Sequence, residues 1–81
     1  MTYIKYEITI FPSKTYIEYV AFENDNLQKY EIVKFAEDII RQIEITHMIY
    51  NGVDSLKNFN PIIKYSIINK KEWDTNNGYY A

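Results

Sequence analysis

Residues 2–11, TYIKYEITIF, alternate in side-chain character along their whole length. One set of alternate positions holds Ile4, Tyr6, Ile8 and Ile10, and the other holds Tyr3, Lys5, Glu7 and Thr9. A period of two in β-branched and aromatic residues predicts a strand with one side in the core. The other predicted elements must therefore pack around this strand.

A second strand is predicted at residues 15–22, TYIEYVAF. Pro12-Ser13-Lys14 before it predicts a turn, because proline presets a turn dihedral and cannot donate to a β-ladder. The short connection makes the two strands an antiparallel hairpin. The alternation of the second strand is ambiguous. Glu18 shares its register with Tyr16, which favours Ile17 and Tyr19 facing the core and Tyr16 facing outward.

Residues 27–50 predict a long amphipathic helix, because apolar residues recur at spacings of three and four and charged residues occupy the opposite face. The apolar set is Ile32, Val33, Ala36, Ile39, Ile40 and Ile43. Asp25 or Asn26 is the expected N-cap, and Asn51-Gly52 the expected C-cap. An alternative ends the helix near Glu44 and makes residues 46–50 a strand.

Residues 53–60 predict a short helical turn capped by Asp54, and residues 61–69, PIIKYSIIN, predict a third strand. Proline is tolerated at the first position of a strand. Two strands, a helix and a further strand predict an α+β fold. We expect a small two-layer sandwich, with a three- to four-stranded antiparallel sheet and one long amphipathic helix on one face. The other face of the sheet is left open.

Composition limits the class of protein. With 81 residues the chain is expected to form a single domain, residues 1–81. It has no cysteine, which excludes disulfides, thiolate nucleophiles and cysteine-based metal sites. The N-terminus lacks the features of a signal peptide, and no apolar run approaches the ~18–20 residues that span a bilayer. The expectation is a cytoplasmic protein without membrane association.

No catalytic signature stands out. His47 is the only histidine, and its place near the apolar stripe favours a structural role over that of a general base. Glu37 and Asp38 point to different parts of a helix surface, so they do not form an acid/base pair. The glycines occur singly, in turns, and do not form a phosphate-binding loop. The sequence predicts no enzyme, no metal and no cofactor.

Tyrosine and lysine are interleaved on the predicted open face of the sheet. Tyr3 and Lys5 come from the first strand, Tyr16 from the second and Lys64 from the third. Such a surface suits single-stranded nucleic acid, whose bases stack on aromatic rings while lysines meet phosphates. It also suits a protein partner, because tyrosine is enriched at interface cores.

The polar tail at residues 69–81, NKKEWDTNNGYYA, adds further candidates: Lys70, Lys71, Trp73, Tyr79 and Tyr80. Three interpretations are open. The aromatic residues fold back over the small core with Asn76-Asn77-Gly78 as the turn, or dock on a second copy in a homodimer, or form a binding patch for another macromolecule.

These features favour a small non-enzymatic binding protein that occupies a surface of a protein or a protein–nucleic-acid complex. Ile, Lys, Asn and Tyr make up roughly half of the chain, which is typical of AT-rich coding. A virus-encoded inhibitor of a bacterial host or defence system, such as an anti-CRISPR protein, would fit this composition. The alternative is a single-stranded RNA- or DNA-binding module that uses the tyrosine and lysine face.

Overall fold

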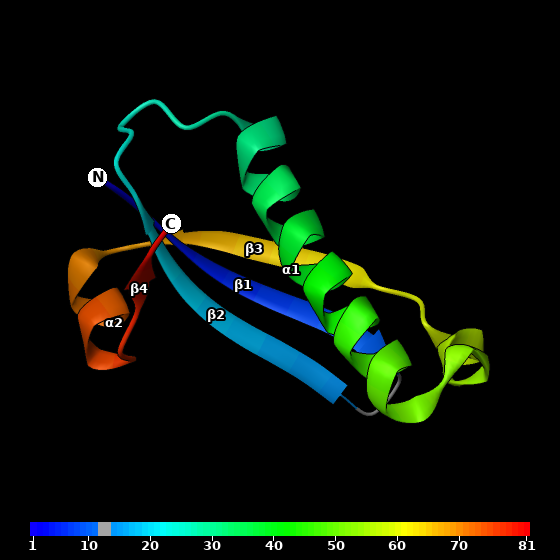
Figure 1. The fold of residues 1–81 in the computed structure, drawn as a ribbon. Coiled ribbons are helices and arrows are strands. Elements are labelled where there is room, and N and C mark those ends of the chain that lie inside the picture. The colour runs from blue at the N-terminus through cyan, green and yellow to red at the C-terminus, as the bar shows by residue number, and fades with distance from the viewer. Residues whose placement is uncertain (12–13) are drawn as a thin grey trace.

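The computed structural model describes residues 1–11 and 14–81. Along the chain it contains β1 (Thr2–Phe11), β2 (Lys14–Phe22), α1 (Lys29–Asn51), the 3-10 helix η1 (Val53–Asn58), β3 (Ile62–Ile68), α2 (Lys70–Thr75) and β4 (Tyr79–Tyr80). Figure 1 shows α1 lying across one face of the sheet. The turn predicted at Pro12-Ser13 lies outside the described residues.

The strands form one sheet in the order β3-β1-β2-β4. β1 pairs antiparallel with both β2 and β3, whereas the two-residue β4 pairs parallel with β2. The α+β sandwich with one long helix is thereby confirmed. The one departure is β4, whose parallel pairing makes the sheet mixed.

The core lies between β1 and α1. Ile4, Tyr6, Ile8 and Ile10 have at most 1% of their surface exposed, since β1 is central and these side chains face the helix. Ile32, Ala36 and Ile40 of α1 close this core from the other side. These are the two apolar sets that the sequence periodicity identifies.

The C-terminal end of α1 agrees with the prediction to within one residue, whereas its first residue is Lys29 and not Leu27. It continues beyond Glu44 to Asn51, and the backbone N–H of Gly52 donates to the Met48 carbonyl oxygen at 2.8 Å. The alternative strand at residues 46–50 is therefore wrong.

The predicted N-cap of α1, Asp25 or Asn26, is also wrong. The N-cap is Gln28, whose backbone N–H donates to Glu31 Oε2 at 2.8 Å. Asp25 is engaged elsewhere, because its carboxylate pairs with the N-terminal ammonium of Met1. That pairing holds the pKa of Asp25 below its usual value.

The predicted register of β2 is wrong. Val20 lies opposite Ile4 and Tyr16 opposite Ile8, and directly opposed residues of antiparallel strands share a face. Tyr16 therefore faces the helix side, while Ile17 and Tyr19 face the open side. Glu18 is tolerated on the helix side because it remains partly exposed there, near the edge of the sheet.

The short helices complete the fold. The predicted turn at residues 53–60 is present as η1, but its N-cap is Gly52 and not Asp54. The helix α2 was not predicted, since six residues are too few to show a period. Asn69 Oδ1 caps it by accepting from the Glu72 backbone N–H at 2.8 Å. The predicted turn follows α2, with Asn77 at a φ of 54°.

Candidate binding surface on the open face of the sheet

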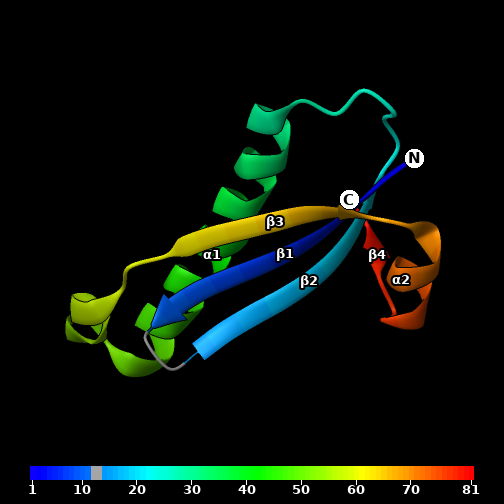
Figure 2. The same cartoon turned by 180° about the vertical axis from the view of Figure 1, so that it is seen from behind.

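The sheet face opposite α1 carries three rows of side chains that run across β3, β1 and β2. We call these nine residues the open face; their rows are Ser66–Lys5–Tyr19, Lys64–Glu7–Ile17 and Ile62–Thr9–Thr15. The positions follow from the pairing, because residues directly opposed in antiparallel strands point to the same side. Figure 2 views the molecule from this side, with α1 behind the strands.

A fourth row, Ile68–Tyr3–Ala21, is covered by the tail. Trp73 of α2 is only 7% exposed, and its ring centroid lies 5.4 Å from that of Tyr3 and 5.1 Å from that of Tyr80. Its indole Nε1–H donates to the Tyr79 carbonyl oxygen at 3.2 Å. The tail thus folds back on its own sheet, as the first of the three interpretations predicts, but it does not cover the core: Trp73 packs on the face away from α1, and Tyr79 and Tyr80 remain 40% and 63% exposed.

Charge on the open face differs in sign from that of the whole chain. Lys5 Nζ lies 3.4 Å from Glu7 Oε1 and 5.9 Å from the centroid of the Tyr19 ring. Lys64 lies directly opposite Glu7, on the neighbouring strand β3. Two lysines against one glutamate leave this face with one positive charge, whereas the chain carries −2.

Two isoleucines on the open face are half exposed to solvent. Ile17 and Ile62 each expose 52% of their surface, on β2 and β3 respectively. Sequence reasoning missed Ile17 because the wrong register placed it in the core. The sequence of β2 held no signal that could have found it, because apolar residues occupy both faces of this strand.

The structure brings together only some of the predicted binding residues. Two of them, Lys5 and Lys64, lie on the open face. Three more lie in or against the neighbouring row that the tail covers: Tyr3, Trp73 and Tyr80. Lys70 and Lys71 are exposed on α2 next to it.

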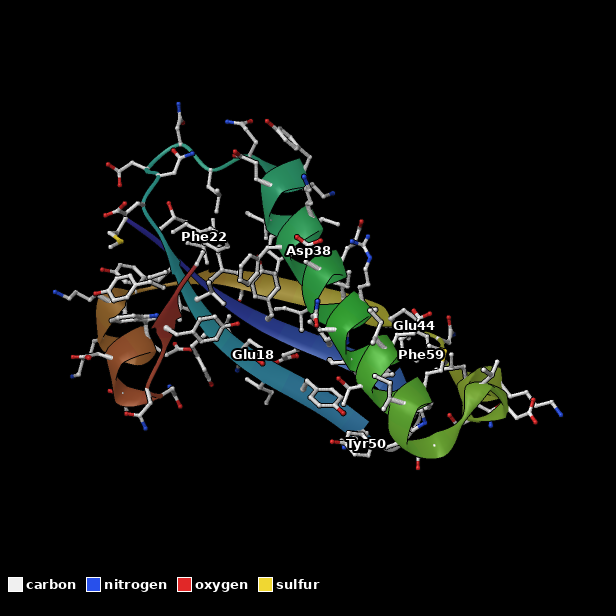
Figure 3. The ribbon with its side chains drawn as sticks, in the orientation of Figure 1. Glu18, Phe22, Asp38, Glu44, Tyr50 and Phe59 are labelled. Atoms are coloured by element: carbon white, nitrogen blue, oxygen red, sulfur yellow. The ribbon has the colours of Figure 1, made fainter. Side chains whose placement is uncertain are left out.

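Tyr16 and Tyr79 lie on the helix side instead. Lys14 Nζ is 5.0 Å from the centroid of the Tyr16 ring. Figure 3 shows Glu18 on the β2 strand, and the strand pairing places Tyr79 of β4 on the same side of the sheet. Burial and the adjacent Glu18 charge raise the pKa of Tyr79 to about 12. Both tyrosines are therefore separated from the open face by the thickness of the sheet.

His47 packs near the end of α1, against Phe11 and Asn51. Its ring lies 4.9 Å from the ring of Phe11, and Nδ1 is 3.4 Å from Asn51 Nδ2. It borders a shallow hollow of about 380 Å³ between α1 and the start of β2, where Tyr16 and Tyr50 also lie. Within residues 1–11 and 14–81, no cluster of three or more acidic, histidine or cysteine side chains could hold a metal.

Comparison with known proteins identifies no relative. No family model matches the chain, and neither a curated protein nor a solved structure is significantly similar to it. No helix in the described part of the chain is both long and apolar enough to cross a membrane.

Proposed function

We propose that this chain is a non-enzymatic binding protein that docks on a protein partner through the open face. The observation that supports the proposal most directly is the pair of half-exposed isoleucines, Ile17 and Ile62, beside the charged residues of β1 and β3. Apolar anchors set among a few charged groups are characteristic of protein–protein interfaces.

The support beneath this face is rigid. β1 is the central strand, and the residues that alternate with Lys5 and Glu7 are fully buried against α1. Lys5 is held between Glu7 and the Tyr19 ring, and Thr9 Oγ1 lies 3.1 Å from Thr15 Oγ1. Side chains ordered before binding lose less entropy when the partner arrives. The partner would present apolar side chains to the isoleucines and a carboxylate to Lys5 or Lys64.

The packing of the aromatic rings favours a protein partner over nucleic acid. Stacking of bases needs free ring faces, but Trp73 is buried against Tyr3 and Tyr80. The Tyr19 ring is next to Lys5. A single-stranded nucleic-acid binder remains the alternative. The finer role that we propose is a virus-encoded inhibitor that covers a surface of a host or defence complex, on the grounds of size and AT-rich composition.

Replacing Ile17 with arginine separates these alternatives. In Ile17→Arg the new guanidinium lies opposite Glu7, so the fold should be retained. It removes an apolar anchor and adds a positive charge to the face. Capture of a protein partner from lysate of the host cell should fall at least about tenfold, whereas binding to single-stranded RNA or DNA should strengthen.

Ile49→Arg on α1 is the matched control, because Ile49 is exposed and lies away from the open face. It should capture the same partner as the unaltered chain, and both variants should keep the melting temperature. Equal capture by Ile17→Arg and the unaltered chain would refute the open face as the docking surface. The nucleic-acid alternative would be supported if nucleic acid co-purifies with the chain and is removed by nuclease, and if Ile17→Arg binds it more tightly.

A further inference from the structure

The strand β3 forms one edge of the sheet. It pairs with β1 on one side, and its other side has no strand partner within the described residues. The short helices on either side of it in sequence turn away, since η1 packs on α1, and α2 packs on β1 and β2. Figure 2 shows β3 running along the border of the sheet between these two helices.

The edge strand β3 lacks most of the features that prevent an edge strand from pairing with a strand of another chain. Proteins usually protect an edge strand with charges, proline, a bulge or a covering element. β3 has the sequence IIKYSII, with Lys64 as its one charged residue. Its pairing with β1 shows no register shift. Ile62 and Ile67 expose 52% and 72% of their surface. A regular, apolar edge with unpaired backbone groups is suited to the addition of another strand.

The sequence of β3 is also nearly symmetric about Tyr65. Reading outward from Tyr65 in both directions, Lys64 matches Ser66, Ile63 matches Ile67 and Ile62 matches Ile68. In an antiparallel pair of two such strands centred on Tyr65, isoleucine would meet isoleucine at four positions. Each Lys64 would meet a serine and not another lysine, so like charges would not oppose each other.

We propose that two copies of this chain associate through β3 in this register and form one continuous eight-stranded sheet. Such a contact has a two-fold axis, which makes the interface self-complementary. Ile63, Tyr65 and Ile67 lie on the helix side of the sheet, because they pair with Ile8, Tyr6 and Ile4. The pairing joins helix side to helix side, so the exposed Ile67 is covered by Ile63 of the second copy. This proposal rests on the free edge of β3 and on Ile67, which is on the other side of the sheet from the open face, although Ile62 and Lys64 belong to both surfaces.

The other free edge is a poorer candidate. β2 is partly covered by β4 at Val20 and Ala21, and its remaining part carries both Lys14 and Glu18. Its sequence, KTYIEYVAF, has no comparable symmetry. The partner that fits β3 best is therefore a second β3.

Light scattering on a size-exclusion column tests the proposal over micromolar to millimolar concentrations. The unaltered chain should approach twice the 9.8 kDa mass of one chain as its concentration rises. Ile67→Asp should stay monomeric, because it would place a carboxylate against Ile63 of the second copy. Ile49→Asp is the matched control, as Ile49 is also 72% exposed but lies on α1. It should dimerise like the unaltered chain.

Ser66→Glu tests the register. In the proposed pairing each new carboxylate meets Lys64 of the second copy, and within its own chain it lies opposite Lys5. The dissociation constant should fall about 2- to 30-fold, since two ion pairs are gained per dimer. In an arrangement that does not bring residue 66 near a lysine of the second copy, an added negative charge on a chain of net charge −2 would weaken association. Three results would overturn the proposal. The unaltered chain could stay monomeric at all concentrations, Ile67→Asp could leave the dimer intact, or Ser66→Glu could weaken it.

Discussion

Tyr6 connects the sheet to the helix by a hydrogen bond as well as by packing. Its side chain is fully buried, and its hydroxyl donates to the Ile32 carbonyl oxygen at 2.7 Å. Its ring is stacked against Phe35, with centroids 5.9 Å apart. Burial raises the pKa of the Tyr6 hydroxyl well above its usual value, and the neighbouring Tyr79 and Tyr65 add to this effect. The hydroxyl must therefore stay protonated for the fold to be stable.

The raised pKa of Tyr6 predicts a loss of stability at high pH. A tyrosine whose pKa is higher in the folded than in the unfolded state contributes to the free energy of unfolding. This contribution is complete below the unfolded pKa of about 10, and it is lost as the pH rises from there through the folded pKa. Tyr6→Phe should lower the free energy of unfolding by about 1 kcal/mol at neutral pH. It should then lose less stability than the unaltered chain between about pH 9 and pH 11.

Urea unfolding across this pH range measures both effects. Tyr30→Phe is the control, because Tyr30 is 71% exposed. That variant should follow the unaltered chain at every pH. Parallel stability curves for Tyr6→Phe and the unaltered chain would contradict the prediction.

Gly78 is required by the packing of Trp73. A Cβ atom at this position would lie 2.2 Å from both Cδ1 and Nε1 of the indole ring. Gly78→Ala should therefore displace Trp73 and destabilise the tail by about 1–3 kcal/mol. The chain has one tryptophan, so its fluorescence reports this site alone. We expect the emission of Gly78→Ala to shift to longer wavelength.

Gly52→Ala provides the comparison. Gly52 has a φ of 83° but no atom within 4 Å of an added Cβ. Its substitution should cost stability through backbone strain and leave the tryptophan emission of the folded chain unchanged. A shift in that emission for Gly52→Ala, or none for Gly78→Ala, would show that the tail is held differently.

At the scale of elements, α2 and β4 form a unit that is attached to the sheet by few contacts. β4 pairs with β2 at two residues, and the Ala81 backbone N–H donates to the Ala21 carbonyl oxygen at 2.9 Å. Trp73 is the one buried residue of α2. Units with little buried surface open at lower free energy than the rest of a fold. The tail is therefore expected to open before β1, β2, β3 and α1 do.

Trp73→Ala should separate the tail from the rest of the fold. Removal of a buried tryptophan costs about 3–5 kcal/mol in a closed core, and the loss here should be confined to α2 and β4. Hydrogen exchange should show faster exchange at Tyr79, Tyr80 and Ala81, with unchanged protection at the centre of β1. Uniform loss of protection across the sheet would mean that the tail belongs to the global folding unit.

At the scale of the whole molecule, apolar burial and not charge pairing holds the described fold together. No polar or charged residue in the described ranges is buried. The ion pairs there join Met1 to Asp25, Lys5 to Glu7 and Asp38 to Arg41, and each includes a well-exposed side chain. Exposed pairs contribute roughly 0–1 kcal/mol each and are screened by salt.

Stability should therefore depend little on ionic strength. We expect the melting temperature at a fixed low concentration to change by no more than about 3 °C between about 0.02 and 0.5 M NaCl. Thermal unfolding followed by circular dichroism measures this directly. A much larger fall at high salt would show that charge pairs carry a substantial share of the stability.

The sequence by itself determined β1, α1 and β3, and with them the fold class. Local pattern alone identifies each of these elements, and in β1 and α1 it also identifies the side that is buried. β1 shows this most clearly, since its four predicted core residues are fully buried.

Tertiary structure alone decided the register of β2, the docking of the tail and the make-up of the open face. Both faces of β2 carry apolar residues, so only its pairing with β1 and the position of α1 decide that Val20 is buried and Ile17 is exposed. Trp73 finds its place through Tyr3 and Tyr80, which are distant from each other in sequence. Such contacts join residues that are far apart in the sequence, so the local periodicity of side chains cannot predict them. They depend on which surfaces the other elements leave uncovered.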